Sequence, residues 1–232
     1  MESTKVAGVP LTIIKKVELM DQLKKAIKEN RQLSLVAVNA RKIVKTVRDA
    51  KMRMIMDSFD IRYADGTAVV KAAEVPLERI TGIDLLTDIC RESDKMGARL
   101  FFYGAEEESN VQAQKNLRKQ FPKIQIAGYC NGYEDGDVLT KIKDSGANVL
   151  FVAKGTPLQE EWIIEHKKSL DVNILMGVGG ALDIWSGKTK RAPEYVQRAG
   201  MEWLYRMIRE PGRFAQLPEL FAFHAMIRRE KR

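Results

Sequence analysis

The stretch Val149-Leu150-Phe151-Val152-Ala153 is a run of five apolar residues that leads directly into Lys154-Gly155-Thr156-Pro157. A short continuous apolar run is typical of a strand covered on both faces, because both rows of its side chains lie in a core. Five more β-rich runs occur, at residues 33–38, 61–64, 99–103, 124–128 and 173–177. Segments of helical period separate most of them, and this βαβ order predicts an α/β fold with a mostly parallel sheet and helices on both faces. Ahead of the sheet we expect a short hairpin over residues 6–14, around Pro10, and a helix over residues 17–27.

The composition is that of a folded protein with a basic tail. The chain has 232 residues, of which 45% are hydrophobic and 30% charged, enough for one core. We expect that core over residues 1–192 and a smaller appendage over residues 193–232. The formal net charge is +8, and residues 188–232 carry 11 Lys and Arg against 5 Asp and Glu. Most of the excess charge therefore lies in the tail, where it favours phosphates, nucleic acid or an anionic membrane surface.

Two amphipathic helices are expected in the appendage. The first follows Pro193 and continues to about residue 209, with Met201, Leu204, Met207 and Ile208 on one apolar stripe; the second covers residues 217–227 and leads into a basic C-terminus. Aromatic side chains such as Phe221 beside clustered cations suit shallow insertion into an anionic interface. Three alternatives stay open: a solvated basic helix, packing on the core, and packing on a second subunit in a homo-oligomer.

The sequence also bears on the compartment. The N-terminus shows no basic region followed by a long apolar run, and no stretch of about 18 consecutive apolar residues occurs. We therefore expect a cytoplasmic protein that touches a membrane, at most, from one side.

Polar groups and glycines follow several of the expected strands. Ligands of open parallel sheets bind at the carboxyl ends of the strands, so these positions are candidates for a site. They are Asn39, Asp65, Gly104, Gln159, Gly179 and Gly180. Structural alternatives exist for three of them: Asn39 could only cap a helix, Asp65 could only turn the chain or cap the next helix, and Gly104 could belong to a plain βα turn.

Several common sites are disfavoured. The glycine pattern at residues 177–180 is no G-x-G-x-x-G, because Leu182 stands at the third glycine position, and no P-loop signature occurs. Two cysteines and two histidines lie far apart, without metal-ligand spacing. Asp135 and Asp137 have the Asp-x-Asp spacing of some Mg²⁺ or Mn²⁺ sites, but capping of the helix that follows explains them better. We expect no bound metal and no cofactor.

Seven short motifs occur in one order over nearly the whole chain, at residues 36–40, 63–66, 81–84, 155–160, 177–180, 190–193 and 202–206. Taken together, they resemble the WecG/TagA/CpsF family of bacterial glycosyltransferases. The resemblance implies a Rossmann-like core and a C-terminal appendage that supplies arginines and membrane contact. It also implies an inverting, metal-independent transfer of N-acetylmannosamine or N-acetylmannosaminuronic acid. The UDP-sugar would be the donor, and the acceptor would be N-acetylglucosamine on a polyprenyl diphosphate at the inner face of the cell membrane.

The resemblance also implies roles for individual residues. Asp65 matches the proposed general base of the family. Arg191, Arg206 and Arg213 would stabilise the charge of the diphosphates, and the donor pocket would be lined by Asn39, Gly104, Gln159, Gly179 and Gly180. The chain departs from the family pattern at Ala37, Arg41 and Leu158, which leaves the donor sugar open; Arg41 could pair with the carboxylate of a uronate.

Two other classes of function remain as alternatives. A nucleic-acid-binding protein would explain the basic tail, although no recognition motif is present and no nucleic acid is expected. A catalytically silent adaptor could keep the fold and dock on membrane enzymes. Retention of Asp65, Gln159 and Arg191 together favours an enzyme.

Overall fold

The chain folds around a parallel sheet with an α/β architecture, as the sequence predicts. The computed structural model describes residues 1–133 and 136–230, without the side chains of Pro211 and Arg213. In this part of the chain, six strands form a parallel sheet in the order β4-β3-β8-β7-β5-β6. Their bounds are β3 (Leu33–Val38), β4 (Ile61–Ala64), β5 (Arg99–Gly104), β6 (Gln125–Cys130), β7 (Val149–Ala153) and β8 (Ile174–Gly177). All six expected strands are confirmed to within three residues at each end.

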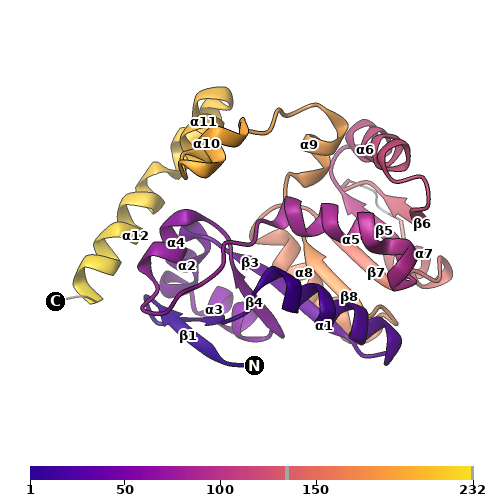
Figure 1. Ribbon diagram of the computed structural model, residues 1–232, viewed down its shortest axis with the longest axis horizontal. Helices are drawn as coiled ribbons and strands as arrows, with labels where there is room; N and C mark the ends of the chain where they lie inside the picture. Colours follow the sequence, from indigo (N-terminus) through magenta and orange to yellow (C-terminus); the bar gives the residue numbers. More distant parts are fainter. Residues whose placement is uncertain (134–135, 231–232) are drawn as a thin grey trace.

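Helices cover both faces of the sheet, and each face has its own core (Figure 1). The alternation of side chains along each strand divides the cores: Phe102 and Phe151 point to one face, Phe101 and Leu150 to the other. The first face carries α1 (Lys16–Lys28), α5 (Gly82–Met96), α6 (Glu107–Gln120) and α9 (Ala181–Ser186). The second carries α2 (Ala40–Arg48), α3 (Ala50–Asp57), α4 (Thr67–Ala72), α7 (Val138–Asp144) and α8 (Leu158–His166).

The N-terminal hairpin covers residues 3–12, a few residues earlier in the chain than the predicted range of 6–14. It pairs β1 (Ser3–Val6) with β2 (Val9–Thr12), so Pro10 lies within a strand and not in the turn. Ala7 and Gly8 make the turn, both with positive φ, of 50° and 72°. Glycine is common at turn positions with positive φ, so Gly8 indicated the turn, whereas Pro10 did not.

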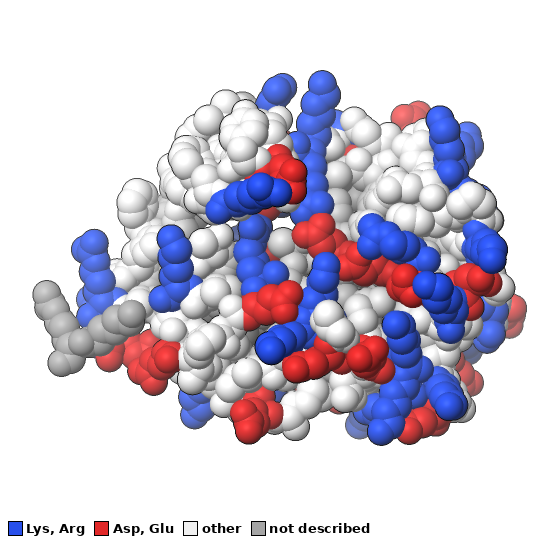
Figure 2. All heavy atoms as spheres, in the orientation of Figure 1, with Lys and Arg blue, Asp and Glu red and all other residues white. Residues whose placement is uncertain are grey.

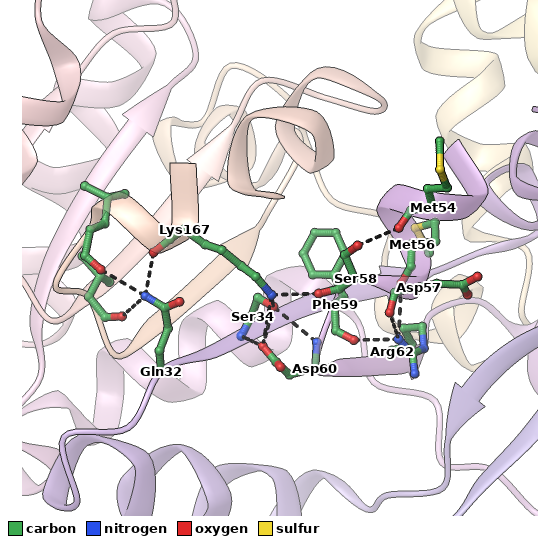
Figure 3. A network of polar contacts seen from close by, with 12 residues as sticks. Gln32, Ser34, Met54, Met56, Asp57, Ser58, Phe59, Asp60, Arg62 and Lys167 are labelled. Atoms are coloured by element: carbon green, nitrogen blue, oxygen red, sulfur yellow. Dashed lines mark hydrogen bonds and ion pairs between the residues drawn. The ribbon is translucent and has the colours of Figure 1, made fainter. Parts of the chain in front are cut away.

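A polar network fastens the amino-terminal edge of the sheet (Figure 3). Asp60, just before β4, accepts hydrogen bonds from the backbone N–H and the hydroxyl of Ser34 in β3, at 2.8 and 2.6 Å. Lys167, in a short 3₁₀ turn (Lys167–Ser169), donates to Ser58 O, and Gln32 Nε2 donates to Lys167 O. These contacts connect the start of β3 and β4 to the segment that follows α8.

The appendage contains more helices than expected. The first expected helix is divided into α10 (Glu194–Arg198) and α11 (Glu202–Arg209), because Gly200 adopts a left-handed φ of 72° between them. The single apolar stripe is therefore wrong: Met207 is buried, whereas Ile208 is exposed. A 3₁₀ segment (Pro211–Gln216) then leads into α12 (Leu217–Glu230).

Helix α12 packs against α2 (Figure 1). Phe223 is fully buried there in the second core, and Glu230 accepts a hydrogen bond from Ala7 N at 2.9 Å. Packing on the core, one of the open alternatives, is thus confirmed for one face of this helix. The other face is different, since Phe221 is 69% exposed.

Candidate active site

A cavity of about 500 Å³ opens at the carboxyl ends of β3, β4, β7 and β8. It lies beside the neighbouring strands β3 and β8, whose following helices α2 and α9 cover opposite faces of the sheet. Such a switch point is the expected position for a ligand in an open α/β sheet. Six of the expected site residues line it: Asn39, Asp65, Gln159, Gly179, Gly180 and Arg206. A second cavity of about 220 Å³ adjoins it and shares Asp65 with it; Arg79, Glu202 and Trp203 line only the second cavity of the two.

Asp65 lies at the junction of the two cavities. Its backbone N–H donates to Val38 O at 2.9 Å, which extends the β3–β4 ladder by one residue. Gly66, with φ of 111°, then begins α4 without any side-chain cap, so the alternative that Asp65 caps this helix is wrong. Burial raises the pKa of Asp65 to about 6, and the nearby cations Arg79, Lys42 and Arg206 act in the opposite direction. A carboxyl group with such a pKa is suited to accept a proton near neutral pH.

Asn39 and Gln159 are held in place by the backbone around the cavity. Asn39 Oδ1 accepts a hydrogen bond from Lys42 N at 3.0 Å and so caps α2, while the residue also lines the cavity. Gln159 Oε1 accepts from Gly179 N at 2.9 Å. A Cβ at Gly177 would lie 2.7 Å from Gln159 Nε2, so a glycine is needed where this amide packs on the chain.

Two expected site residues lie outside the lining of these cavities. Gly104, at the end of β5, is needed for close strand packing, because a Cβ there would lie 2.4 Å from Ala153 O. Arg191 is engaged by Asp84 through two hydrogen bonds, of 2.7 and 2.8 Å. Burial alone would raise the pKa of Asp84, but the hydrogen bonds from Arg191 and Thr81, together with the positive charges of Arg191 and Lys16, outweigh burial and lower that pKa. In this structure Arg191 therefore fastens the loop after α9 to α5.

The appendage contributes to the site through α11. Arg206 lines both cavities, and a Cβ at Gly180 would lie 3.7 Å from one of its terminal nitrogens. Arg79 donates to Glu202 at 2.7 Å and to Gln197 O at 3.3 Å, which connects the core to α11 and α10. Arg213 is expected to contact a diphosphate, but its side chain is outside the part of the chain that the structure describes.

Comparison with known proteins identifies the family to which this site belongs. Residues 4–232 match the glycosyl transferase WecG/TagA/CpsF family. The chain belongs to this family. A curated relative from Bacillus spizizenii, N-acetylglucosaminyldiphosphoundecaprenol N-acetyl-beta-D-mannosaminyltransferase, is 32% identical over 195 residues. The match covers 82% of this chain and 76% of the relative. The resemblance seen in the motifs is confirmed, and the chain is a glycosyltransferase.

Arg41 has a partner within this glycosyltransferase. Its Nε lies 2.8 Å from Glu219 Oε2 at the start of α12. Arg41 also lines the main cavity, so the idea that it faces a uronate carboxylate stays a prediction.

Asp137, in the acidic motif after β6, is not among the residues that line these cavities. Asp137 caps α7, accepting a hydrogen bond from Thr140 N at 3.0 Å, as capping predicts; Asp135 lies outside the described residues. In the described part of the chain, no group of three or more His, Cys, Asp and Glu side chains could hold a metal ion. A search of the same residues finds no helix with the length and apolar character to cross a bilayer.

Sequence reasoning missed Lys42, Glu160 and Arg79, three charged residues at or next to the cavities of the glycosyltransferase. Arg79 had a visible signal, because it stands two residues before the motif at residues 81–84. Glu160 had one too, because it is the last residue of the motif at residues 155–160. Lys42 had none, since it resembles any charged residue of a helix until the fold brings α2 and α8 together.

Charges of both signs are interspersed on the face of the enzyme shown in Figure 2. A continuous basic stripe, which is the electrostatic footprint of many nucleic-acid-binding proteins, is not seen on that face. The family assignment excludes nucleic-acid binding as the main function of this chain.

Proposed function

We propose that this enzyme transfers N-acetylmannosamine or N-acetylmannosaminuronic acid from a UDP donor to N-acetylglucosamine on a polyprenyl diphosphate, with inversion at the anomeric carbon. The name of the Bacillus spizizenii relative supports the acceptor and the first of these sugars. Undecaprenyl-linked sugars are intermediates of cell-envelope polysaccharides, which is the process we propose for it.

One observation carries the proposal: Asp65 lies where two cavities meet at the switch point of the sheet. A transferase that joins two sugars in one step needs its base between a donor site and an acceptor site. We assign the larger cavity, with its glycine turn (residues 177–180), to the UDP-sugar. The smaller one, on the other side of Asp65, receives the acceptor sugar.

The proposed reaction is a single displacement. The acceptor hydroxyl, expected to be the 4-hydroxyl of N-acetylglucosamine, attacks the anomeric carbon from the face opposite UDP. The new carbon–oxygen bond forms as the bond to the diphosphate oxygen breaks, and the hydroxyl proton passes to the Asp65 carboxylate. UDP leaves with the electron pair. General-base catalysis of this kind contributes about 10²- to 10⁴-fold.

Side chains, in this proposal, take the place of a metal at the diphosphates. Arg206 and Arg79 line the cavities, and the cationic field of both acts on Asp65. Fixed cations at a leaving diphosphate stabilise the charge that develops as UDP departs. The enzyme should therefore work in EDTA and without any cofactor. Arg191 and Arg213 remain proposed contacts for the acceptor diphosphate, and Arg191 would have to leave Asp84 to make one.

The appendage is the proposed membrane contact. A surface groove of about 530 Å³ on the outer side of α12 is lined by Phe221, His224, Arg228 and Arg229. An exposed aromatic ring beside two arginines is suited to an anionic lipid surface. The enzyme would then act as a peripheral protein on the cytoplasmic side of the membrane that holds its acceptor, alone or as a homo-oligomer.

The test is a transfer assay with purified protein, a soluble prenyl-diphosphate N-acetylglucosamine analogue and a panel of UDP sugars, all in EDTA. Product mass identifies the donor, and NMR of the new linkage gives its configuration. A β-linked N-acetylmannosamine or mannosaminuronic acid product is expected. No product from any donor, in EDTA or with Mg²⁺ restored, would contradict the proposal; product only with Mg²⁺ would contradict its metal-free part.

A further inference from the structure

A buried ion pair joins Lys42, which lines the main cavity, to Glu160. Lys42 Nζ, from α2, lies 2.8 Å from Glu160 Oε1, from α8, and the two side chains are 5% and 1% exposed. Buried pairs of this kind add little stability compared with apolar residues of similar size, because both charges lose their hydration. Among the described residues, the second carboxylate oxygen of Glu160 is buried without a hydrogen-bond partner. The pair is therefore poorly explained as a device for stability.

The ammonium group of Lys42 lies where the neighbouring strands β3 and β8 cease to pair. Pairing of β3 with β8 ends at Leu35, whereas pairing with β4 continues to Val38. Val38 O accepts from Asp65 N on the β4 side. Carbonyl groups alternate sides along a strand, so Ala37 O points to the side that β8 has left. Lys42 Nζ donates to Ala37 O at 2.8 Å and takes the place of the missing ladder partner.

The carboxylate of Glu160 connects this point to the glycine turn. Gln159 Nε2 donates to Glu160 Oε1 at 2.7 Å. The amide nitrogen of Gln159 is thus used, and its carbonyl oxygen faces Gly179 N, which donates to it at 2.9 Å. The lack of a side chain at Gly177 makes room for this amide. A continuous set of contacts therefore runs from the end of β3, through the ion pair, to the turn that ends β8.

We infer that Lys42 and Glu160 are positioning residues for the nucleotide diphosphate of the donor. They keep β3 and β8 apart at the carboxyl edge and fix the glycine turn, so that its backbone N–H groups and Arg206 meet the phosphates in one arrangement. Neither residue needs to touch the reacting atoms. This inference rests on the proposed function, because it takes a UDP-sugar as the occupant of the cavity.

The experiment compares Glu160→Gln, the double variant Lys42→Met/Glu160→Gln and the control Glu161→Gln. The control lies next to Glu160 on α8 and removes an exposed pair, in which Lys51 Nζ lies 2.9 Å from Glu161 Oε1. UDP affinity is measured by calorimetry, donor KM and kcat by product release, melting by fluorescence, and exchange of the Gly179 amide by hydrogen-exchange mass spectrometry.

Misplaced phosphate contacts should weaken UDP binding and raise donor KM by about tenfold in both Glu160 variants, with kcat changed much less. The double variant should melt higher than Glu160→Gln, because no unpaired charge stays buried, yet should not recover UDP affinity. Exchange at Gly179 should be faster in both, and the control should match the wild type.

Two results would overturn the inference. One is a folded double variant that binds UDP within a factor of two of the wild type, with Gly179 still protected. The other is a double variant that cannot fold, which would make the pair a structural element. A wild-type enzyme that does not bind UDP, while Gly179 exchange still depends on the pair, would contradict the proposed donor and leave the positioning contacts in place.

Discussion

Replacement of Asp65 by asparagine should make the folded enzyme more stable at neutral pH. The folded protein raises the pKa of this carboxyl group from 3.8 to about 6, chiefly by burial. Above pH 6 the ionised carboxylate therefore has a higher free energy in the folded protein than in the unfolded chain. At 1.36 kcal/mol per pKa unit, the difference amounts to about 3 kcal/mol at pH 7.5. Solvent reaches part of the side chain, so this figure is an upper value.

The sign of the effect fixes its pH dependence. Because the folded pKa is raised, the contribution of Asp65 to stability is highest below about pH 4, where both states are protonated. It falls between about pH 4 and pH 6, where only the unfolded chain is ionised, and changes little above pH 6. Asparagine carries no charge at any of these values. The advantage of Asp65→Asn should therefore shrink to about 1 kcal/mol at pH 4.5.

The assay is urea unfolding followed by circular dichroism at pH 7.5 and 4.5, for the wild type, Asp65→Asn and the exposed control Asp171→Asn. The difference between the first two, taken at each pH, cancels the titration of all other groups. The reasoning is refuted if Asp65→Asn is no more stable than the wild type at pH 7.5, or if its advantage is equal at both pH values.

Three further outcomes are expected. Gly177→Ala should raise donor KM by about tenfold in the transfer assay, because the new methyl group displaces the Gln159 amide; unchanged KM would be the contrary result. Arg191→Met should lower the free energy of unfolding by about 1 kcal/mol at pH 7, with a smaller loss near pH 3, because the lowered pKa of Asp84 adds stability only above its unfolded pKa; equal loss at both pH values would contradict this. Phe221→Ser should weaken binding to anionic vesicles about tenfold in a flotation assay, since it removes an exposed ring from the lipid contact; equal flotation of both proteins would refute that contact.

The sheet could be predicted from the sequence because its central strands are buried on both faces. Runs such as Val149–Ala153 are apolar throughout, and the helices between them leave few possible connections. Helix boundaries in the appendage were less visible. Gly200 stops a helix there because of its left-handed backbone, and a single glycine inside a helical pattern carries no certain signal.

The candidate site could be predicted where its residues lie at or shortly after the ends of strands. Asn39 and Asp65 follow β3 and β4 directly, Gln159 lies in the first turn of the helix after β7, and the topology brings all three to one edge. The pairs formed by Lys42 with Glu160 and by Arg191 with Asp84 join residues more than a hundred positions apart. No local pattern encodes such a contact, so the sequence predicts Arg191 as a diphosphate contact but gives no sign of its hydrogen bonds to Asp84.

The most direct measurement is UDP binding and sugar transfer on the same Asp65→Asn protein. If Asp65 is the general base, UDP affinity should stay within about threefold of the wild type, while transfer falls by about 100-fold or more. Transfer that continues at the wild-type rate, in a variant that binds UDP normally, would contradict the role of Asp65 and with it the proposed mechanism.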